Sequence, residues 1–306
     1  MPTQFLESLG GQLAERWMAT LFTPALVFWL GGLAAWIQQF GWDELETWLN
    51  AQSEPIQITL IAGSLLLVAA SAFIVQQLEL PALQVLEGYW PVWLSRLRRY
   101  GIRRQRQILK RKEQRWQQLA RQREQQGLTP AETDDYIRLD WQLRQFPSQP
   151  GRLMPTRLGN LLRAAEDLPQ IKYGLDAILC WPRLWMLLPE PVKTDLQAAR
   201  AELNTAARVW LWGLCFLVWW IWAWWAFPIG LLIAWFAYRW LLRAAATYAT
   251  LLESAFDLHR LALYQSLRWP LPTNPAEEQR MGQQLTAYLW RGSDSTQPKF
   301  VLPQQD

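Results

Sequence analysis

Long stretches without a single Asp, Glu, Lys or Arg dominate this sequence. The longest separates Arg208 from Arg239, and two more lie at residues 17–37 and 57–76. Each of these two has about twenty residues, enough for a helix to cross the roughly 30 Å hydrocarbon core of a bilayer. Because 51% of the 306 residues are apolar and they cluster in these stretches, the pattern predicts an all-α, polytopic membrane protein.

The stretch after Arg208 is too long for one ordinary span. Its sequence is interrupted at residues 227–230 by Phe-Pro-Ile-Gly. Proline readily opens a helix and glycine permits a tight turn, so a turn is predicted there. We therefore expect spans three and four at 209–226 and 229–248, with the Arg239 side chain reaching the headgroups near the inner end of span four.

The charges around the first two predicted spans indicate their orientation. The connection between these spans, residues 38–56, holds four acidic residues and no basic one. Residues 96–123, after the second span, hold twelve Lys and Arg but a single acid, Glu113. Because basic residues are retained on the cytoplasmic side of a membrane, we expect the middle section and, with four spans, both termini to be cytoplasmic.

Four predicted spans divide the chain into five parts. Residues 1–16 lack the basic run of a secretory signal, so we expect the first span to remain in the mature protein. The parts are an N-terminal amphipathic segment at 1–16, a first transmembrane hairpin at 17–78, a cytoplasmic helical section at 79–208 with a basic arm at 93–126, a second, Trp-rich transmembrane hairpin at 209–248, and cytoplasmic C-terminal helices with a tail at 249–306.

The basic arm is rich in Gln and Arg and carries a weak apolar stripe, so it is predicted as an exposed helix. Its candidate partner is the anionic lipid headgroup, contacted through Arg98, Arg99, Arg103 and Arg104. Nucleic acid is the disfavoured partner. The alternative is a solvated face that only sets the topology.

Small residues gather in the second predicted span, and they allow helices to approach one another closely. Ordinary packing between helices is the favoured interpretation. The alternative is a pore, for which the candidate lining residues are Thr23, Ser64 and Ser71.

Cysteine and histidine usage gives no indication of a metal or cofactor. The chain has Cys180, Cys215 and one histidine, His259. Cys215 lies in an apolar stretch, so both thiols are predicted to be reduced. No spacing of His, Cys, Asp or Glu resembles a zinc site, and no cofactor is expected.

Two sequence signals predict helix starts outside the spans. Thr129-Pro130-Ala131-Glu132 matches a capping box with proline at the first helical position, and it predicts a helix through Arg144. Asn274-Pro275-Ala276-Glu277 repeats the pattern and predicts a C-terminal helix through Tyr288.

Residues 155–190, PTRLGNLLRAAEDLPQIKYGLDAILCWPRLWMLLPE, concentrate charged, aromatic and turn residues. With DLHR at 257–260 and TPALVFWLGG at 23–32, this segment resembles an uncharacterised family of bacterial multi-pass membrane proteins. Its members share PTRLGN-LRAAED, YG-DA and WPRL between two pairs of spans. The resemblance covers most of the chain and implies the bacterial cytoplasmic (inner) membrane. It implies no activity, because none is known for the family.

The residues of this segment also have a physical interpretation. Thr156 is predicted to cap a helix that Pro169 ends, and within this helix Arg163 is at salt-bridge spacing from Glu166 or Asp167. A second short element is predicted to end near Pro182, and Asp176 is a candidate for a buried ion pair with Arg157, Arg163 or Arg183. Such a segment forms either a structural collar or a site for a ligand or partner. The candidate residues of that site are Arg157, Asn160, Arg163, Glu166, Asp167, Tyr173, Asp176, Trp181 and Arg183.

The motifs of common enzymes are not found in the sequence: there is no GxSxG, HExxH, P-loop or kinase motif. We therefore expect no enzymatic activity. Two classes of function remain. The favoured one is a membrane-anchored scaffold or accessory protein that binds a partner through its cytoplasmic section. The alternative is a homo-oligomeric ion or small-solute channel.

Overall fold

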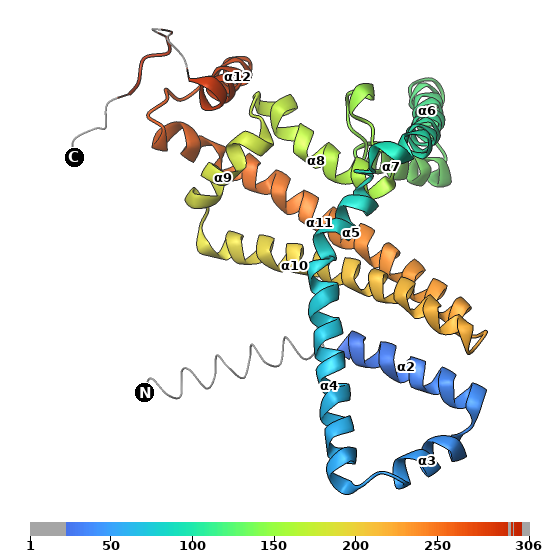
Figure 1. Ribbon diagram of the computed structural model, residues 1–306. Helices are drawn as coiled ribbons and strands as arrows, with labels where there is room; N and C mark the ends of the chain where they lie inside the picture. The colour runs from blue at the N-terminus through green and yellow to red at the C-terminus, as the bar shows by residue number, and fades with distance from the viewer. Residues whose placement is uncertain (1–22, 293–294, 296, 302–306) are drawn as a thin grey trace. The chain divides into compact units, whose positions relative to one another are not determined.

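The computed structural model describes residues 23–292, 295 and 297–301, and the regular elements in these ranges are all helices (Figure 1). The all-α prediction is confirmed. The predicted segment 1–16 and the start of the first predicted span, 17–22, lie outside the described residues. In chain order, with η for 3₁₀, the helices are α2 (Thr23–Phe40), α3 (Trp42–Asn50), α4 (Glu54–Gln77), α5 (Glu79–Glu87), η2 (Val92–Leu94), α6 (Ser95–Gln125), α7 (Pro130–Leu143), η3 (Pro150–Arg152), α8 (Arg157–Tyr173), α9 (Ala177–Leu187), α10 (Glu190–Phe216), η4 (Leu217–Ile221), α11 (Ala226–Ser266) and α12 (Pro275–Arg291).

The chain divides into two compact units. Unit 1 takes the residues up to Leu83 together with Ala201–Leu241, and unit 2 takes Gln84–Arg200 together with the residues from Leu242 on. The helices α5, α10 and α11 therefore contribute residues to both units.

Two of the described helices, α4 and α11, are long and apolar enough to cross a membrane. The second predicted span, 57–76, lies within α4, and the fourth, 229–248, lies within α11. The prediction of four spans is not confirmed, because α2 and α10 do not reach the same combination of length and apolar character.

The turn of the second hairpin lies earlier than predicted. The α-helical part of α10 ends at Phe216, the 3₁₀ helix η4 follows, and α11 already begins at Ala226. Pro228 is therefore the third residue of α11, where a helix needs no N–H donor. Gly230 is a packing residue, because a Cβ there would lie 2.8 Å from the carbonyl oxygen of Gly213.

The core of unit 1 lies between α2, α4 and α10. Ala25, Val68, Ala72, Val75 and Trp212 form its buried cluster. In α2, a Cβ on Gly31 or Gly32 would lie 2.4 Å from a ring carbon of Phe216 or Trp219, respectively. These two glycines make room for the aromatic side chains of the second hairpin.

The core of unit 2 is built by α8, α9 and α12 with the parts of α10 and α11 in this unit. Its largest fully buried side chains include Phe256, Tyr264, Leu184 and Leu285. The helices α6 and α7 pack as a separate pair: Trp116 stacks on Tyr136 with ring centroids 5.5 Å apart.

The predicted capping box of α7 is confirmed, since Thr129 and Glu132 exchange both of its hydrogen bonds. The N-terminal capping of α12 differs from this pattern. Asn274 caps the helix, but the Glu277 carboxylate accepts from the N–H of Thr273 at 2.9 Å, not from Asn274. The helix also continues to Arg291, past the predicted end at Tyr288.

Two prolines that were predicted to end helices lie inside them. Pro169 is part of α8, which continues to Tyr173 and ends where Gly174 adopts a left-handed conformation (φ +72°). Pro182 is part of α9, which continues to Leu187. Each proline removes one helical hydrogen bond, but Pro169 is itself buried, and Leu184 after Pro182 packs into the core.

Candidate binding cleft

The PTRLGN segment joins the start of α8 to the end of α5. Thr156 caps α8 by accepting a hydrogen bond from the N–H of Gly159 at 3.0 Å, and its hydroxyl donates to the carbonyl of Glu87 at 2.9 Å. The buried Asn160 side chain accepts from the N–H of Met154 at 2.8 Å and donates to its carbonyl at 3.1 Å. Thr156 and Asn160 therefore hold backbone segments together.

Arg163 and Glu166 lie one turn apart on α8 and form the predicted ion pair, at 3.5 Å. Arg163 also donates to the hydroxyl of Tyr89 at 2.7 Å. Asp167 pairs instead with Arg152, at 2.7 Å. Burial raises the pKa of the Glu166 and Asp167 carboxyls, and the nearby guanidinium groups oppose this shift only in part.

Near the end of α8, side chains reach across to α11. Lys172 forms ion pairs with Glu253 at 2.6 Å and Asp257 at 3.2 Å. The hydroxyl of Tyr173 donates to Asp257 at 2.6 Å. Although burial opposes the charged form, the hydrogen bonds to the two carboxylates hold the pKa of Lys172 above its ordinary value. The YG and DLHR segments, far apart in sequence, thus meet.

A further contact extends this set of charges to α12. The guanidinium of Arg260 lies 4.1 Å from the ring centroid of Tyr173, and its Nε lies 2.7 Å from Oε1 of Glu278. Gly282 permits the approach of α12, because a Cβ there would lie 1.9 Å from the carbonyl oxygen of Tyr173. We call the set the charge ladder; its members are Lys172, Tyr173, Glu253, Asp257, Arg260 and Glu278.

The candidate site residues at the start of α9 and within it stabilise this helix and its packing on the core. Asp176 caps α9 by accepting from the N–H of Leu179 at 3.0 Å. The expected ion pair of Asp176 is wrong, since no arginine pairs with it in the part of the chain that the structure describes. Trp181 packs on Phe256 with ring centroids 5.9 Å apart, and Arg183 donates to the carbonyl of Leu179 at 2.7 Å.

The nine predicted candidates do not converge on one cavity. Arg163 and Glu166 lie together, Tyr173 belongs to the charge ladder, and Arg157 is exposed in the first turn of α8. Most of the others support the backbone or the core. Within this segment, these residues therefore form a rigid framework rather than a ligand pocket.

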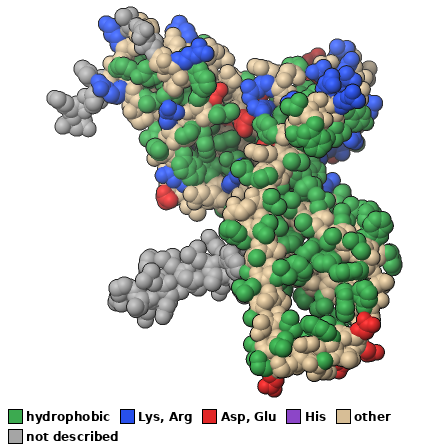
Figure 2. Space-filling model, viewed as in Figure 1, with side chains coloured by type: hydrophobic (Ala, Val, Ile, Leu, Met, Phe, Trp, Pro, Cys, Tyr) green, Lys and Arg blue, Asp and Glu red, His purple; other side chains and the backbone are tan. Residues whose placement is uncertain are grey.

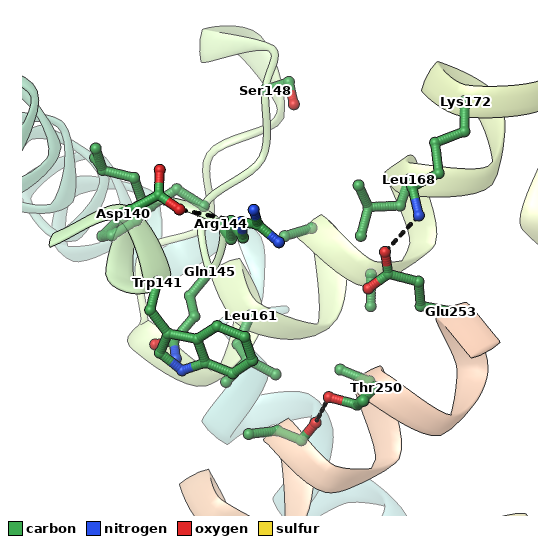
Figure 3. A pocket seen from close by; sticks show the side chains of 16 residues that line it. Asp140, Trp141, Arg144, Gln145, Ser148, Leu161, Leu168, Lys172, Thr250 and Glu253 are labelled. Carbon is green, nitrogen blue, oxygen red and sulfur yellow. Dashed lines mark hydrogen bonds and ion pairs between the residues drawn. The ribbon is translucent and has the colours of Figure 1, made fainter. Parts of the chain in front are cut away.

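A cleft of about 570 Å³ lies beside this framework, between α7, α8 and α11 (Figure 3). Figure 3 shows Trp141 and Leu161 facing the same space, with Thr250 on the opposite wall. Two pairs of charges lie at its rim: Arg144 with Asp140 at 3.5 Å, and Lys172 with Glu253. The lining residues are Asp140, Trp141, Leu143, Arg144, Gln145, Phe146, Ser148, Leu161, Ala164, Ala165, Leu168, Lys172, Ala246, Ala249, Thr250 and Glu253.

The candidate pore residues lie in unit 1 and have different surroundings. The Ser71 hydroxyl accepts a hydrogen bond from the indole N–H of Trp29 at 3.1 Å, so it joins α4 to α2. Ser64 is exposed, and its hydroxyl donates to the carbonyl of Ile61 in its own helix at 2.7 Å. Thr23 is the first residue of α2.

Comparison of the chain with known protein families, with characterised proteins and with solved structures finds no significant match. The fold and the cleft therefore carry the functional argument. Among the described residues, no group of three or more His, Cys, Asp or Glu is placed to hold a metal ion.

Several residues that matter for this region have no signal in the sequence. Tyr89, Arg152, Glu253 and Glu278 each contact a candidate residue or the charge ladder, but lie far from it in the chain or on another element. The cleft was also missed, because its walls come from three helices separated by long segments.

Proposed function

We propose that this protein is a membrane-anchored scaffold whose unit 2 binds a partner protein in the cleft. The observation that carries the proposal is the make-up of the cleft: aliphatic and small side chains of α8 and α11 form its wall, and charged side chains lie at its rim. A groove of this kind accepts the apolar face of an amphipathic helix, while the rim contacts polar residues of that helix. The expected occupant is therefore an amphipathic helix of the partner.

Binding is favoured over catalysis by the state of the charged groups in the cleft. Asp140 pairs with Arg144, and Lys172 pairs with Glu253. General acid–base catalysis needs a group that is free to exchange a proton with a substrate. Because these pairs keep the charged forms together, they suit recognition.

Anchoring in a membrane is supported by the surface of α4. Ile58, Ile61, Leu66 and Phe73 are each more than half exposed, and the residues of α4 before Val68 are all unburied within the chain. In water, so large an apolar surface promotes association and aggregation. In a bilayer, lipid chains cover it at no cost.

Four spans remain our proposal for the anchor. The second hairpin runs beside α2, since Phe216 and Trp219 pack at Gly31 and Gly32 and the indole of Trp225 donates to Gln38. If α2 is embedded, the second hairpin is embedded to a similar depth. The acidic α3 and the basic α6 then favour a cytoplasmic unit 2 and cytoplasmic termini, in a bacterial inner membrane.

The test uses two matched substitutions on α11. Thr250 lines the cleft and Thr247 does not; both side chains are exposed, and each donates to the carbonyl four residues earlier. A photoreactive amino acid at Trp141 should form a discrete heteromeric adduct in cells. Thr250→Trp should abolish this adduct by filling the cleft, whereas Thr247→Trp should leave it unchanged.

Other outcomes contradict the scaffold proposal. An adduct with the mass of two copies of this chain would make the cleft a self-contact. An adduct that survives Thr250→Trp, or the absence of any adduct in cells that express the protein at its natural level, would exclude the cleft as the partner site.

A channel is the second candidate, favoured by one observation. The first half of α4 is apolar and unpacked within the chain, and it carries the exposed Ser64. In a homo-oligomer this half could face other copies around a pore. Light scattering of the purified protein, followed by conductance in planar bilayers, tests it: a closed oligomer whose conductance changes with Ser64→Ala supports the channel, and a silent monomer excludes it.

A further inference from the structure

The 3₁₀ helix η2 and the first turns of α6 carry exposed apolar side chains among arginines. Trp93, Leu97 and Tyr100 are 78%, 50% and 63% exposed. Arg96, Arg103 and Arg104 are exposed beside them, and Figure 2 shows Lys and Arg side chains gathered over α6. We call these six residues the arginine–aromatic surface.

Helical spacing places five of these side chains on one side of α6, and Trp93 lies just before this helix, in η2. Leu97, Tyr100 and Arg104 follow one another at intervals of three and four residues. Arg96 and Arg103 form a neighbouring row along the same side. Of the four arginines predicted to contact lipid, Arg103 and Arg104 lie on this surface, whereas Arg98 projects away from it.

A neighbouring face of α6 is fixed in unit 2. Gly101 lies against the segment that enters α8, since a Cβ there would be 2.7 Å from Cβ of Pro155. Further along, Leu119 is fully buried, and the Lys112 ammonium lies 5.5 Å from the ring centroid of Phe146. The arginine–aromatic surface is therefore presented on a packed support, with its side chains directed outward.

The arginines of this surface lack carboxylate partners. In the part of the chain that the structure describes, Arg96, Arg103 and Arg104 form no ion pair, whereas Arg152, Arg163, Arg208 and Arg260 do. Like charges held close together repel one another unless anions lie near them. An external anionic surface supplies such anions.

We propose that the arginine–aromatic surface docks on the anionic headgroups of the bilayer in which the chain is anchored. Trp and Tyr prefer the membrane interface because their rings are apolar and their polar groups stay hydrated. Arginines flanking them add electrostatic attraction to anionic lipid. Nucleic acid would match the charge and its bases could stack on Trp93, but it does not account for the exposed aliphatic side chain of Leu97.

The chain itself keeps this surface near the membrane. Trp93 follows the end of α4 at Gln77 by sixteen residues, nine of which form α5. Even with the other residues fully extended, the connection spans at most about 40 Å. The inference rests on the proposed membrane anchor, but not on the partner cleft.

The test places an environment-sensitive fluorophore at Val92→Cys, next to Trp93. Val92 is 89% exposed, and a Cys215→Ser background removes the exposed native thiol while Cys180 stays buried. The full chain is reconstituted in vesicles of phosphatidylcholine with or without phosphatidylglycerol, each containing a lipid-borne quencher. We expect quenching at least about twofold stronger with phosphatidylglycerol, because binding depends on anionic headgroups.

Two double variants that lose the same amount of charge show whether the quenching depends on this surface or only on the net charge of the protein. Arg96→Gln with Arg104→Gln should reduce the quenching to its value in phosphatidylcholine alone. Arg98→Gln with Arg106→Gln changes two exposed arginines on the other side of α6, and it should leave the quenching unchanged. Equal losses in both variants would overturn the proposal.

A second label position distinguishes failure of this inference from failure of the anchor. Leu66 is 71% exposed on α4. A fluorophore at Leu66→Cys should be quenched in both kinds of vesicle if the anchor is embedded. A quenched label at position 66 with an unquenched label at position 92 would overturn the docking alone. Unquenched labels at both positions would overturn the anchor as well. A label at position 92 shielded by added RNA but not by anionic lipid would make the surface a nucleic-acid site.

Discussion

The charge ladder and the arginine–aromatic surface both lie in unit 2, but they use basic side chains in opposite ways. In the ladder, Lys172 and Arg260 contact carboxylates at 2.6 to 3.2 Å, and Arg260 also lies on the ring of Tyr173. On the surface, Arg96, Arg103 and Arg104 are exposed and form no ion pair among the described residues. The ladder joins α8, α11 and α12, whereas the surface joins nothing within the chain.

This difference separates charges that stabilise the fold from charges that are available to a partner. Changing a member of the ladder should lower the stability of unit 2. Changing the arginines of the surface should leave stability unaltered and alter only binding. Stability measurements on matched variants can therefore test the distinction without knowledge of the partner.

The largest effect is expected where α12 meets the end of α8. In Gly282→Ala, the new Cβ would lie 1.9 Å from the backbone oxygen of Tyr173, so α12 has to move and the ladder loses its geometry. We expect a loss of about 3 kcal/mol in the free energy of unfolding, the upper end for overpacking. Thermal unfolding in detergent, with hydrogen exchange of α8 and α12 as the local readout, measures it.

The control for this substitution is Gly151→Ala, because a Cβ there meets nothing within 4 Å. If the two variants unfold at the same temperature, the close contact between α12 and Tyr173 does not contribute to stability as inferred.

The next largest effect is expected from Arg260→Met. This change leaves Glu278, whose side chain is only 11% exposed, without its ion-pair partner. Breaking a fully buried pair costs about 3–5 kcal/mol, and partial exposure of Arg260 reduces this to about 2 kcal/mol. Arg138→Met, which breaks an exposed pair with Asp135, is the control and should have no measurable effect. Equal shifts in the two variants would contradict the internal role of the ladder.

Local signals in the sequence predicted local structure well. The capping box at Thr129 and Glu132, the cap at Thr156 and the pair of Arg163 with Glu166 all involve residues three apart on one helix. Such contacts depend on helical geometry alone, and that geometry is the same in every helix. The all-helical class follows in the same way from composition and spacing.

Predictions that depended on packing were less successful. Pro169 and Pro182 were expected to end helices because a proline removes a hydrogen bond, but α8 and α9 continue past them, with Pro169 itself buried and Leu184 of α9 packed into the core. Gly230 was predicted to lie in a turn, but it lies in α11, where the missing side chain allows a close contact with Gly213. The ladder went unpredicted because Lys172 and Glu253 are 81 residues apart, and nothing in either local sequence identifies the other.

A smaller effect is expected from Tyr173→Phe. The change removes the 2.6 Å hydrogen bond to Asp257 but keeps the ring beneath Arg260. One such bond to a charged acceptor contributes about 1 kcal/mol at a partly exposed site. Tyr100→Phe, on the arginine–aromatic surface, removes an exposed hydroxyl and should leave the unfolding temperature unchanged. A larger loss in Tyr100→Phe than in Tyr173→Phe would reverse the distinction between the two regions.

The smallest effect concerns Glu166, on α8 between the Arg163 contact and the ladder. Burial raises the pKa of its carboxyl above the ordinary value of 4.5, so the folded state holds this proton more tightly than the unfolded state does. The contribution of Glu166 to stability therefore falls as the pH rises from 4.5 through the raised pKa, and it recovers on acidification.

Glu166→Gln, which is neutral at every pH, should flatten this dependence and should be slightly more stable than the parent at pH 7. Unfolding temperatures of the parent and the variant between pH 5 and pH 7 measure this difference. Glu124→Gln, on the exposed side of α6, is the control for the loss of one carboxylate. If Glu166→Gln is instead less stable at pH 7, the ion pair with Arg163 outweighs burial, and Glu166 belongs with the ladder as a charge that stabilises the fold.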